Sequence, residues 1–184
     1  MSKAFEDATE RAKSAHEGGS RWVPVAAAVL AVLAAVSGFL ANVRATQSLI
    51  AKNDSIVATT RASDTYNEYQ AERLKFAIVE SALEAGTAPP SNAAKLRATA
   101  AREAAKAPPL MTLAQSFEHR ADDLDAKSEH LLSQHETLEI ASTLFEVSIV
   151  LVSVTALVGS RVLPIAAGIA SAVGALAFAL GLLR

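Results

Sequence analysis

The chain has 184 residues, of which 51% are hydrophobic and 5% aromatic, and its formal net charge is -2. No basic stripe suits nucleic acid, and the lack of cysteine excludes disulfides, zinc–thiolate sites and thiol nucleophiles. The apolar residues form two blocks around a charged stretch, which predicts an all-α integral membrane protein.

The N-terminal segment, residues 1–21, predicts a short charged helix over residues 3–17, ended by Gly18–Gly19. Because its apolar stripe is thin, we expect a solvated helix; a helix lying on the membrane surface is the alternative.

Residues 22–43 predict the first transmembrane helix. Residues 23–43 carry no charge and are about 31 Å long at ~1.5 Å per residue, which matches a hydrocarbon core of ~30 Å. Trp22 and Arg21 stand where interfacial anchors are expected. A buried soluble helix is the alternative, but the chain has little other apolar surface to cover it. The length of the apolar run also disfavours a cleaved signal peptide.

Residues 44–137 predict an extramembrane helical hairpin, a coiled-coil-like stalk between the first and second spans. There is no glycine between Arg44 and Ala85, so the first helix should continue outward. Apolar residues every seven positions predict the returning helix, with alanines between them; they are Leu110, Phe117, Leu124, Leu131 and Leu138. The expected seam of the first arm consists of Leu49, Ile50, Ile56, Val57, Tyr69, Phe76 and Leu83.

Two proline pairs, Pro89–Pro90 and Pro108–Pro109, bracket an alanine-rich piece at residues 91–107. Since proline interrupts helical hydrogen bonding, we expect a bent return arm. A third helix folded across the two arms is the alternative.

Residues 138–184 predict a transmembrane hairpin that turns at Gly159–Pro164, with Arg161 at its tip. Three spans place the N-terminus and Arg161 on one side of the bilayer and the central hairpin on the other. The distribution of lysine and arginine favours a cytoplasmic N-terminus.

Small residues recur at every fourth position in the first and third spans, including Ala31 and Ala35, and Ala170 and Gly174. Such rows let helix backbones approach closely. They serve either packing within the three spans or contact with another subunit.

Glu146 is an acidic residue inside the second span, and an ionisable intramembrane group is a functional hypothesis by default. A structural ion pair with Arg44 or Arg184, or placement at the membrane interface, is the expected role, and a proton or ion path is the alternative. His119 with Asp122 and Asp123 has a spacing that could hold a metal, but the signal is weak, as it is for the histidines at 130 and 135. We expect no metal site, no cofactor and no enzyme activity, because no catalytic motif occurs.

The stretch "TYNEYQAERLK" is the most distinctive in the chain. With its tyrosines, Gln70, Ala71, Arg73 and Lys75, it resembles the signature of a bacterial family of unknown function, number 4337. Tyr66 replaces a more usual tryptophan, and Glu72 a frequent lysine. The resemblance implies a membrane protein and brings no known activity or cofactor. The residues expected to pack the hairpin around the signature are Tyr66, Tyr69, Gln70, Arg73, Phe76, Phe117 and Leu124.

These features predict a structural or interaction protein of the bacterial inner membrane, either homo-oligomeric or an accessory subunit of a membrane complex. Its expected partners are the lipid bilayer and its own copies or another membrane protein, not nucleic acid. The alternative is a small oligomeric channel or transporter component with Glu146 near the pathway. A ligand-binding sensor is a weaker hypothesis.

Overall fold

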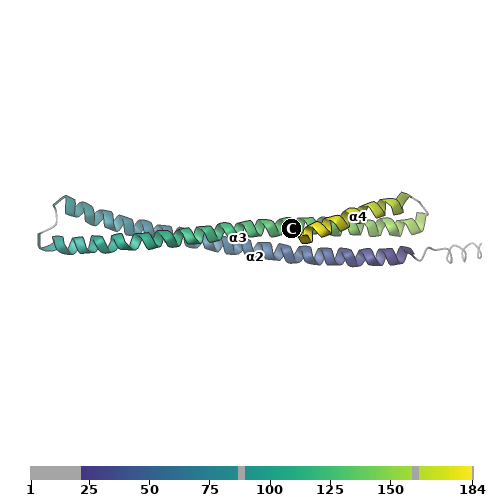
Figure 1. Ribbon diagram of the computed structural model, residues 1–184, viewed down its shortest axis with the longest axis horizontal. Helices are drawn as coiled ribbons and strands as arrows, with labels where there is room; N and C mark the ends of the chain where they lie inside the picture. The colour runs from purple at the N-terminus through teal and green to yellow at the C-terminus, as the bar shows by residue number, and fades with distance from the viewer. Residues whose placement is uncertain (1–21, 87–89, 159–161, 184) are drawn as a thin grey trace, which may run out of the picture. The chain divides into compact units, whose positions relative to one another are not determined.

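The computed structural model describes residues 22–86, 90–158 and 162–183, and this part of the chain is helical, without strands (Figure 1). Its helices are α2 (Trp22–Glu84), α3 (Pro90–Val158) and α4 (Val162–Leu183). Each contains a window long and apolar enough to cross a membrane, as the sequence predicts. The predicted helix at residues 3–17 and the turn carrying Arg161 lie outside the described residues.

Helix α2 is long because no glycine or proline interrupts it after the first span. It ends where glycine allows a left-handed conformation, at Gly86 with φ 65°. The amide of Ala85 donates to the carbonyl of Ser81, and that of Gly86 to Leu83, at 3.0 and 3.2 Å. These bonds close the last turn and satisfy carbonyls that a helix end otherwise leaves unpaired.

Helix α3 runs through Pro108 and Pro109 without ending. The alternative of a third helix over residues 91–107, folded across the two arms, is therefore wrong, whereas the bend expected in the return arm stays a prediction. The two prolines remove the N–H donors that the carbonyls of Ala104 and Ala105 would ordinarily use. Helical structure persists because buried alanines, Ala100, Ala107 and Ala114, lie on both sides of this point.

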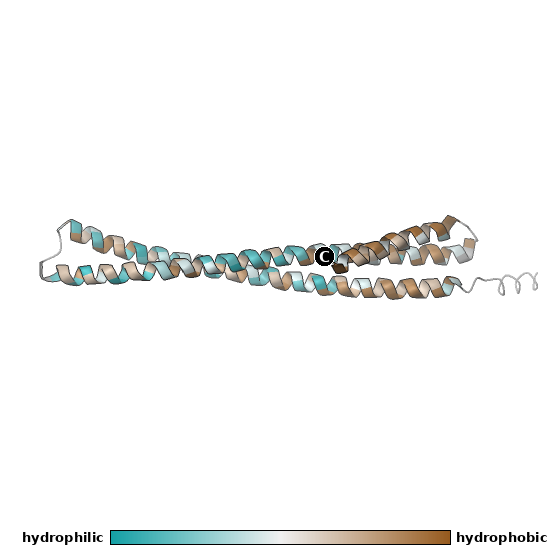
Figure 2. Ribbon diagram, in the orientation of Figure 1, coloured by the Kyte–Doolittle hydropathy of each residue, from teal (hydrophilic) through white to brown (hydrophobic). Residues whose placement is uncertain are grey.

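The chain divides into two compact units. The described part of unit 1 consists of residues 22–46 and 131–183, and unit 2 consists of residues 47–130. The parts of the helices that belong to unit 1 are strongly apolar, whereas hydrophilic residues are frequent in the parts that belong to unit 2 (Figure 2).

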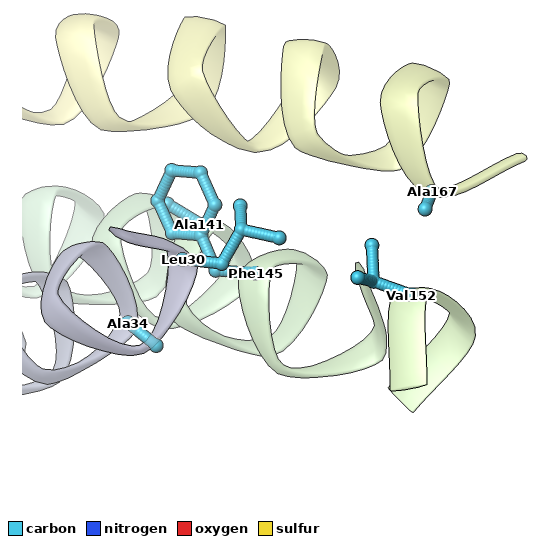
Figure 3. Packing of buried hydrophobic residues seen from close by; sticks show 6 residues of the cluster. All are labelled: Leu30, Ala34, Ala141, Phe145, Val152 and Ala167. Atoms are coloured by element: carbon cyan, nitrogen blue, oxygen red, sulfur yellow. The ribbon is translucent and has the colours of Figure 1, made fainter. Parts of the chain in front are cut away.

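Unit 1 has a narrow core, and many of its large apolar side chains are exposed. Leu30, Phe145 and Val152 form the core with three alanines (Figure 3). On α4 the buried positions are seven residues apart and small, namely Ala167, Gly174 and Gly181. The exposed large side chains include Val32, Phe39, Ile165, Ile169, Val173 and Leu176. This distribution suits helices surrounded by lipid, where small residues mediate packing and large aliphatic ones face the acyl chains.

In unit 2, small residues rather than large ones fill the seam between α2 and α3. Ala114 is fully buried, whereas Phe117 and Leu124 are half-buried. The buried small residues are Ser48, Ala51, Ser55, Ala58, Ala62 and Thr65 on α2, and Ala100, Ala107, Ala114, Ala121 and Ser128 on α3. Their alternating three- and four-residue spacing on α2 follows one face of a helix.

The expected seam of the first arm is wrong at four positions, because Leu49, Ile50, Ile56 and Val57 are exposed. Serine and alanine occupy the seam there, and the serines bond to the other helix's backbone. Ser55 Oγ, for example, donates to the carbonyl of Ala121 at 3.0 Å. These bonds require close helix contact, which larger side chains would prevent.

Candidate functional site

Tyr66 joins the two helices of unit 2. Its hydroxyl donates a hydrogen bond to Glu118 Oε2 at 2.9 Å, next to the half-buried Phe117 on α3. The pKa of Tyr66 is raised above its usual value, and this bond is the main cause. Only the neutral phenol can donate the bond, so the bond favours the protonated form. The first tyrosine of the signature therefore contacts the returning helix.

Tyr69, Arg73 and Phe76 line one side of a cavity in unit 2 of about 620 Å³. The guanidinium of Arg73 lies 6.0 Å from the centre of the Tyr69 ring and donates to its hydroxyl at 3.3 Å. Helix α3 supplies the opposite wall, which consists of Glu103, Ala104, Ala107, Pro108, Met111 and Thr112. Of the remaining predicted residues, Gln70 is exposed, and neither Phe117 nor Leu124 lines the cavity.

Two carboxylates of the cavity wall, Glu72 and Glu103, lie close together, and two lysines accompany them. Glu72 Oε1 accepts from Lys75 Nζ at 2.7 Å, and Glu103 Oε2 accepts from Lys106 Nζ at 2.7 Å. Lys106 Nζ also lies 3.7 Å from Glu72 Oε2, within ion-pair range but beyond a hydrogen bond. The four side chains form a compact network of alternating charge.

Glu72 is the buried member of this network, with 8% of its surface exposed. Its pKa is lowered to about 2, first by hydrogen bonding with the Glu103 carboxyl and then by Lys75. Glu72 is therefore ionised at neutral pH. Its Oε2 is buried beside the Lys106 ammonium, which lies 3.7 Å away.

Sequence reasoning missed the functional interest of Glu72 and Glu103. A signal was present, because Glu72 lies three residues after Tyr69 and four before Phe76, and so shares their helix face. In the sequence, Glu72 stands out only as a departure from the family signature. Glu103 stands between the buried Ala100 and Ala107, and its position depended on α3 continuing through the prolines.

Glu146 is exposed on α3 in unit 1. It forms no ion pair with any described residue, so the expected pair with Arg44 is not formed; Arg184 lies outside the described residues.

Among the small residues singled out in the spans, Ala31 and Ala35 are exposed, Ala170 is half-buried and Gly174 is buried.

The histidines of the described helices do not gather with acidic residues into a metal site. Among the described residues, no group of three or more histidine, cysteine, aspartate or glutamate side chains could hold a metal ion. His135 instead lies in unit 1, with Nδ1 3.0 Å from the carbonyl oxygen of Ala41 and Nε2 3.4 Å from Glu139 Oε2. It joins α2 to α3.

Comparison with known proteins adds the family but no activity. No curated protein and no solved structure matches the chain. The family model described as a domain of unknown function, DUF4337, matches residues 19–184, which include every residue of the tyrosine signature and the cavity. The chain therefore belongs to the DUF4337 family, as its signature predicts.

Proposed function

We propose that this protein is a multi-pass interaction protein of the bacterial inner membrane that associates with its own copies through unit 2. In this proposal, unit 2 lies outside the bilayer as a coiled-coil-like hairpin and the N-terminus is cytoplasmic. The exposure of large aliphatic side chains on α2 carries the proposal. Leu49 is 71% exposed and Ile56 is 56% exposed, seven residues later.

These side chains form a stripe, which consists of Leu49, Ile50, Ile56 and Val57. Burying a large aliphatic side chain stabilises an interface by about 1.5–3 kcal/mol. In unit 2 the seam is occupied by serine and alanine, so this stabilisation is not available within one chain. The two pairs share one helix face, with Asn53 between them, and large apolar side chains gathered on one face outside the bilayer are typical of a protein contact surface.

A second copy of the chain is the partner that the stripe fits best. Copies anchored in the same bilayer lie with the same orientation, so identical stripes can meet around a symmetry axis. The seven-residue interval between Leu49 and Ile56, repeated by Ile50 and Val57, is the interval at which parallel helices meet along a shared seam. Exposed Ala31 and Ala35 in the first span would permit close contact there too.

Native mass spectrometry of the full chain from mild detergent tests self-association. The wild type should be oligomeric, and Leu49→Gln combined with Ile56→Gln should shift it toward monomer. Glu80→Gln is the control, because Glu80 is exposed on the same helix about 35 Å beyond Val57 at ~1.5 Å per residue. A monomeric wild type, or an equal effect of the control, would overturn the proposal; a co-purified different protein would favour an accessory subunit.

A channel or transporter component is the second candidate, and the exposure of Glu146 favours it. Thr143, Glu146 and Ser153 are all exposed and lie within about 80° of one another around α3 at ~100° per residue. A carboxylate facing lipid costs about 2.5–3.5 kcal/mol at the centre of a span on an insertion scale, and less for an off-centre residue such as Glu146. If Glu146 instead faced the identical helices of other copies around a shared axis, part of that cost would be removed.

Ion flux into proteoliposomes separates this candidate from the first. If Glu146 lines a pathway, Glu146→Gln should reduce flux several-fold without changing the oligomer. Asp123→Asn is the control, because Asp123 is exposed on α3 about 140° around from Glu146 at ~100° per residue. If the wild type shows no flux above that of empty liposomes, the channel proposal is contradicted and the interaction-protein proposal is unaffected.

A further inference from the structure

The aliphatic stripe of α2 is one end of a longer exposed face that continues toward the end of the helix. Leu74 is 62% exposed and Ile78 is 60% exposed. Ile78 follows Val57 after three intervals of seven residues, so it lies on the same row as Ile50 and Val57. The face therefore extends from Leu49 to Ile78, about 44 Å at ~1.5 Å per residue.

Three rows of seven-residue spacing make up this face, and all their residues are exposed. The central row consists of Asn53, Thr60, Asn67 and Leu74. The flanking rows consist of Leu49, Ile56, Ser63, Gln70 and Ala77 on one side and of Ile50, Val57, Asp64, Ala71 and Ile78 on the other. Asp64 is the only charged residue of the three rows, whereas charges are frequent among the exposed residues of α3, such as Arg120, Asp122 and Asp123. The face of α2 is therefore the side of unit 2 that is suited to contact with another helix.

Along the helix this face is apolar at both ends and polar in the middle, over residues 63–70. When the α2 helix of a second copy lies parallel and unstaggered, the apolar ends meet each other and the polar middles meet. A shift by one seven-residue repeat, about 10 Å, would instead place Asn67 against Leu74 and Asp64 against Ala71. The order of residues on the face therefore favours the unstaggered arrangement.

The polar side chains of the central row differ in whether they need a partner. Thr60 Oγ1 donates to the carbonyl of Ile56 at 2.9 Å, so its hydroxyl can be buried in an interface without a further hydrogen bond. The amides of Asn53 and Asn67 hydrogen-bond with no residue that the structure describes. Burying an amide without a partner costs free energy, but an asparagine opposite its own equivalent can both donate and accept.

We propose that neighbouring copies pair through this face with their α2 helices parallel and unstaggered, and that Asn53 and Asn67 fix this register. The inference rests on the proposed self-association and adds the alignment of the copies and the residues that determine it. Each asparagine bonds to its equivalent in the other copy. Asn67 also lies one turn from Asp64, so its amide can donate to the Asp64 carboxylate of the other copy. Isolated polar residues in the seam of a parallel coiled coil specify register in this way, at a cost in stability.

Disulfide cross-linking tests the alignment, because the chain contains no cysteine of its own. Thr60→Cys and Ala71→Cys are made singly in the full chain, which is held in mild detergent and oxidised with copper phenanthroline. Each variant should form a disulfide-linked dimer, since unstaggered parallel helices bring both positions to their own equivalents and a disulfide needs Cα atoms within about 7 Å. Ala126→Cys, which is exposed on α3, is the matched control and should stay unlinked on a non-reducing gel.

Native mass spectrometry of the same samples, before oxidation, separates this inference from the proposed self-association. The two positions lie about 16 Å apart along the helix, so an antiparallel pair could link at no more than one of them. An oligomer that does not link at both positions would overturn the alignment and leave self-association intact. A monomer would overturn both proposals.

Substitution of the asparagines tests their role in the register. Asn53→Leu combined with Asn67→Leu should preserve the oligomer but lower the yield of the Ala71→Cys disulfide several-fold, because shifted pairings then leave fewer amides unbonded. Thr60→Val is the control and should leave the yield unchanged, because the Thr60 hydroxyl bonds within α2. An unchanged yield in the asparagine variant, or an equal fall in the control, would show that these amides do not set the register.

Discussion

Ser48 and Ser128 hydrogen-bond to each other's backbone across the seam of unit 2. Ser48 Oγ donates to the carbonyl of Ser128 at 2.9 Å, and Ser128 Oγ donates to the carbonyl of Ser48 at 3.0 Å. The two hydroxyl oxygens are only 3.1 Å apart. An ion pair between Lys52 and Asp125 lies one turn further along both helices, so this point fixes the register of α2 against α3.

Removing these hydroxyls should weaken unit 2 in a coupled way. Ser48→Ala and Ser128→Ala should each lower the free energy of unfolding by about 1 kcal/mol, and the double variant should differ from the sum because the residues are in contact. Thermal unfolding followed by circular dichroism measures the cycle. Ser81→Ala, whose exposed hydroxyl bonds only within α2, is the control; additivity of the two seam variants would contradict the coupling.

Enlarging a seam alanine should destabilise unit 2 more than losing a hydroxyl does. Ala114 is fully buried, so Ala114→Leu must separate the helices or force strained rotamers, at about 1–3 kcal/mol. The same substitution at exposed Ala101 on α3 should change the unfolding temperature little. Equal unfolding temperatures of the two variants would show that the helices do not pack through Ala114.

Replacing a glycine of α4 with alanine should change the stability of the protein by an amount that depends on the space around that glycine. A Cβ at Gly181 would lie 2.8 Å from Leu138 Cγ, and one at Gly174 would lie 3.2 Å from Phe145 Cε1. Leu138 and Phe145 are almost fully buried and have little room to move, so both alanine variants should unfold at lower temperature in detergent. Gly168 has nothing within 4 Å of the same position, so Gly168→Ala should be neutral or stabilising through helix propensity. A similar response at all three positions would contradict this packing.

Hydropathy and family resemblance predicted the chain's helical class and its three span-length apolar segments because both depend on local composition. They did not predict which face of each helix is buried. Leu49 and Ile56 have the seven-residue spacing of a seam, but so do Ser48 and Ser55 on the neighbouring face. Periodicity alone does not choose between the two faces, and hydrophobicity selects the wrong one where serine hydroxyls bond to the opposite backbone.

The cavity could not be predicted from the sequence, for a related reason. Its two walls come from Tyr69–Phe76 and from residues 103–112, so its existence depends on the pairing register and on α3 continuing through Pro108. A proline pair ordinarily predicts a helix boundary, and this expectation separated Glu103 from Glu72. The tyrosine signature supplies part of one wall but carries no information about the opposite one.

The pH dependence of unit 2 should report the ionised state of Glu72. Its pKa falls from 4.5 to about 2 in the folded chain, so the folded state binds fewer protons than the unfolded one between these values. The stabilising contribution is therefore fully present above about pH 4.5 and is lost as the pH falls toward 2. Unfolding temperatures measured across this range should decline more steeply in the wild type than in Glu72→Gln.

A substitution of Lys75 should reduce the pH dependence of stability only in part. Lys75→Met removes the 2.7 Å bond to Glu72, the second cause of the lowered pKa after Glu103, and keeps the length of the side chain. The pKa of Glu72 should rise toward its ordinary value, and the acid-sensitive part of the stability should shrink without disappearing. Parallel curves for the wild type and both variants would mean that Glu72 is not held ionised by this network.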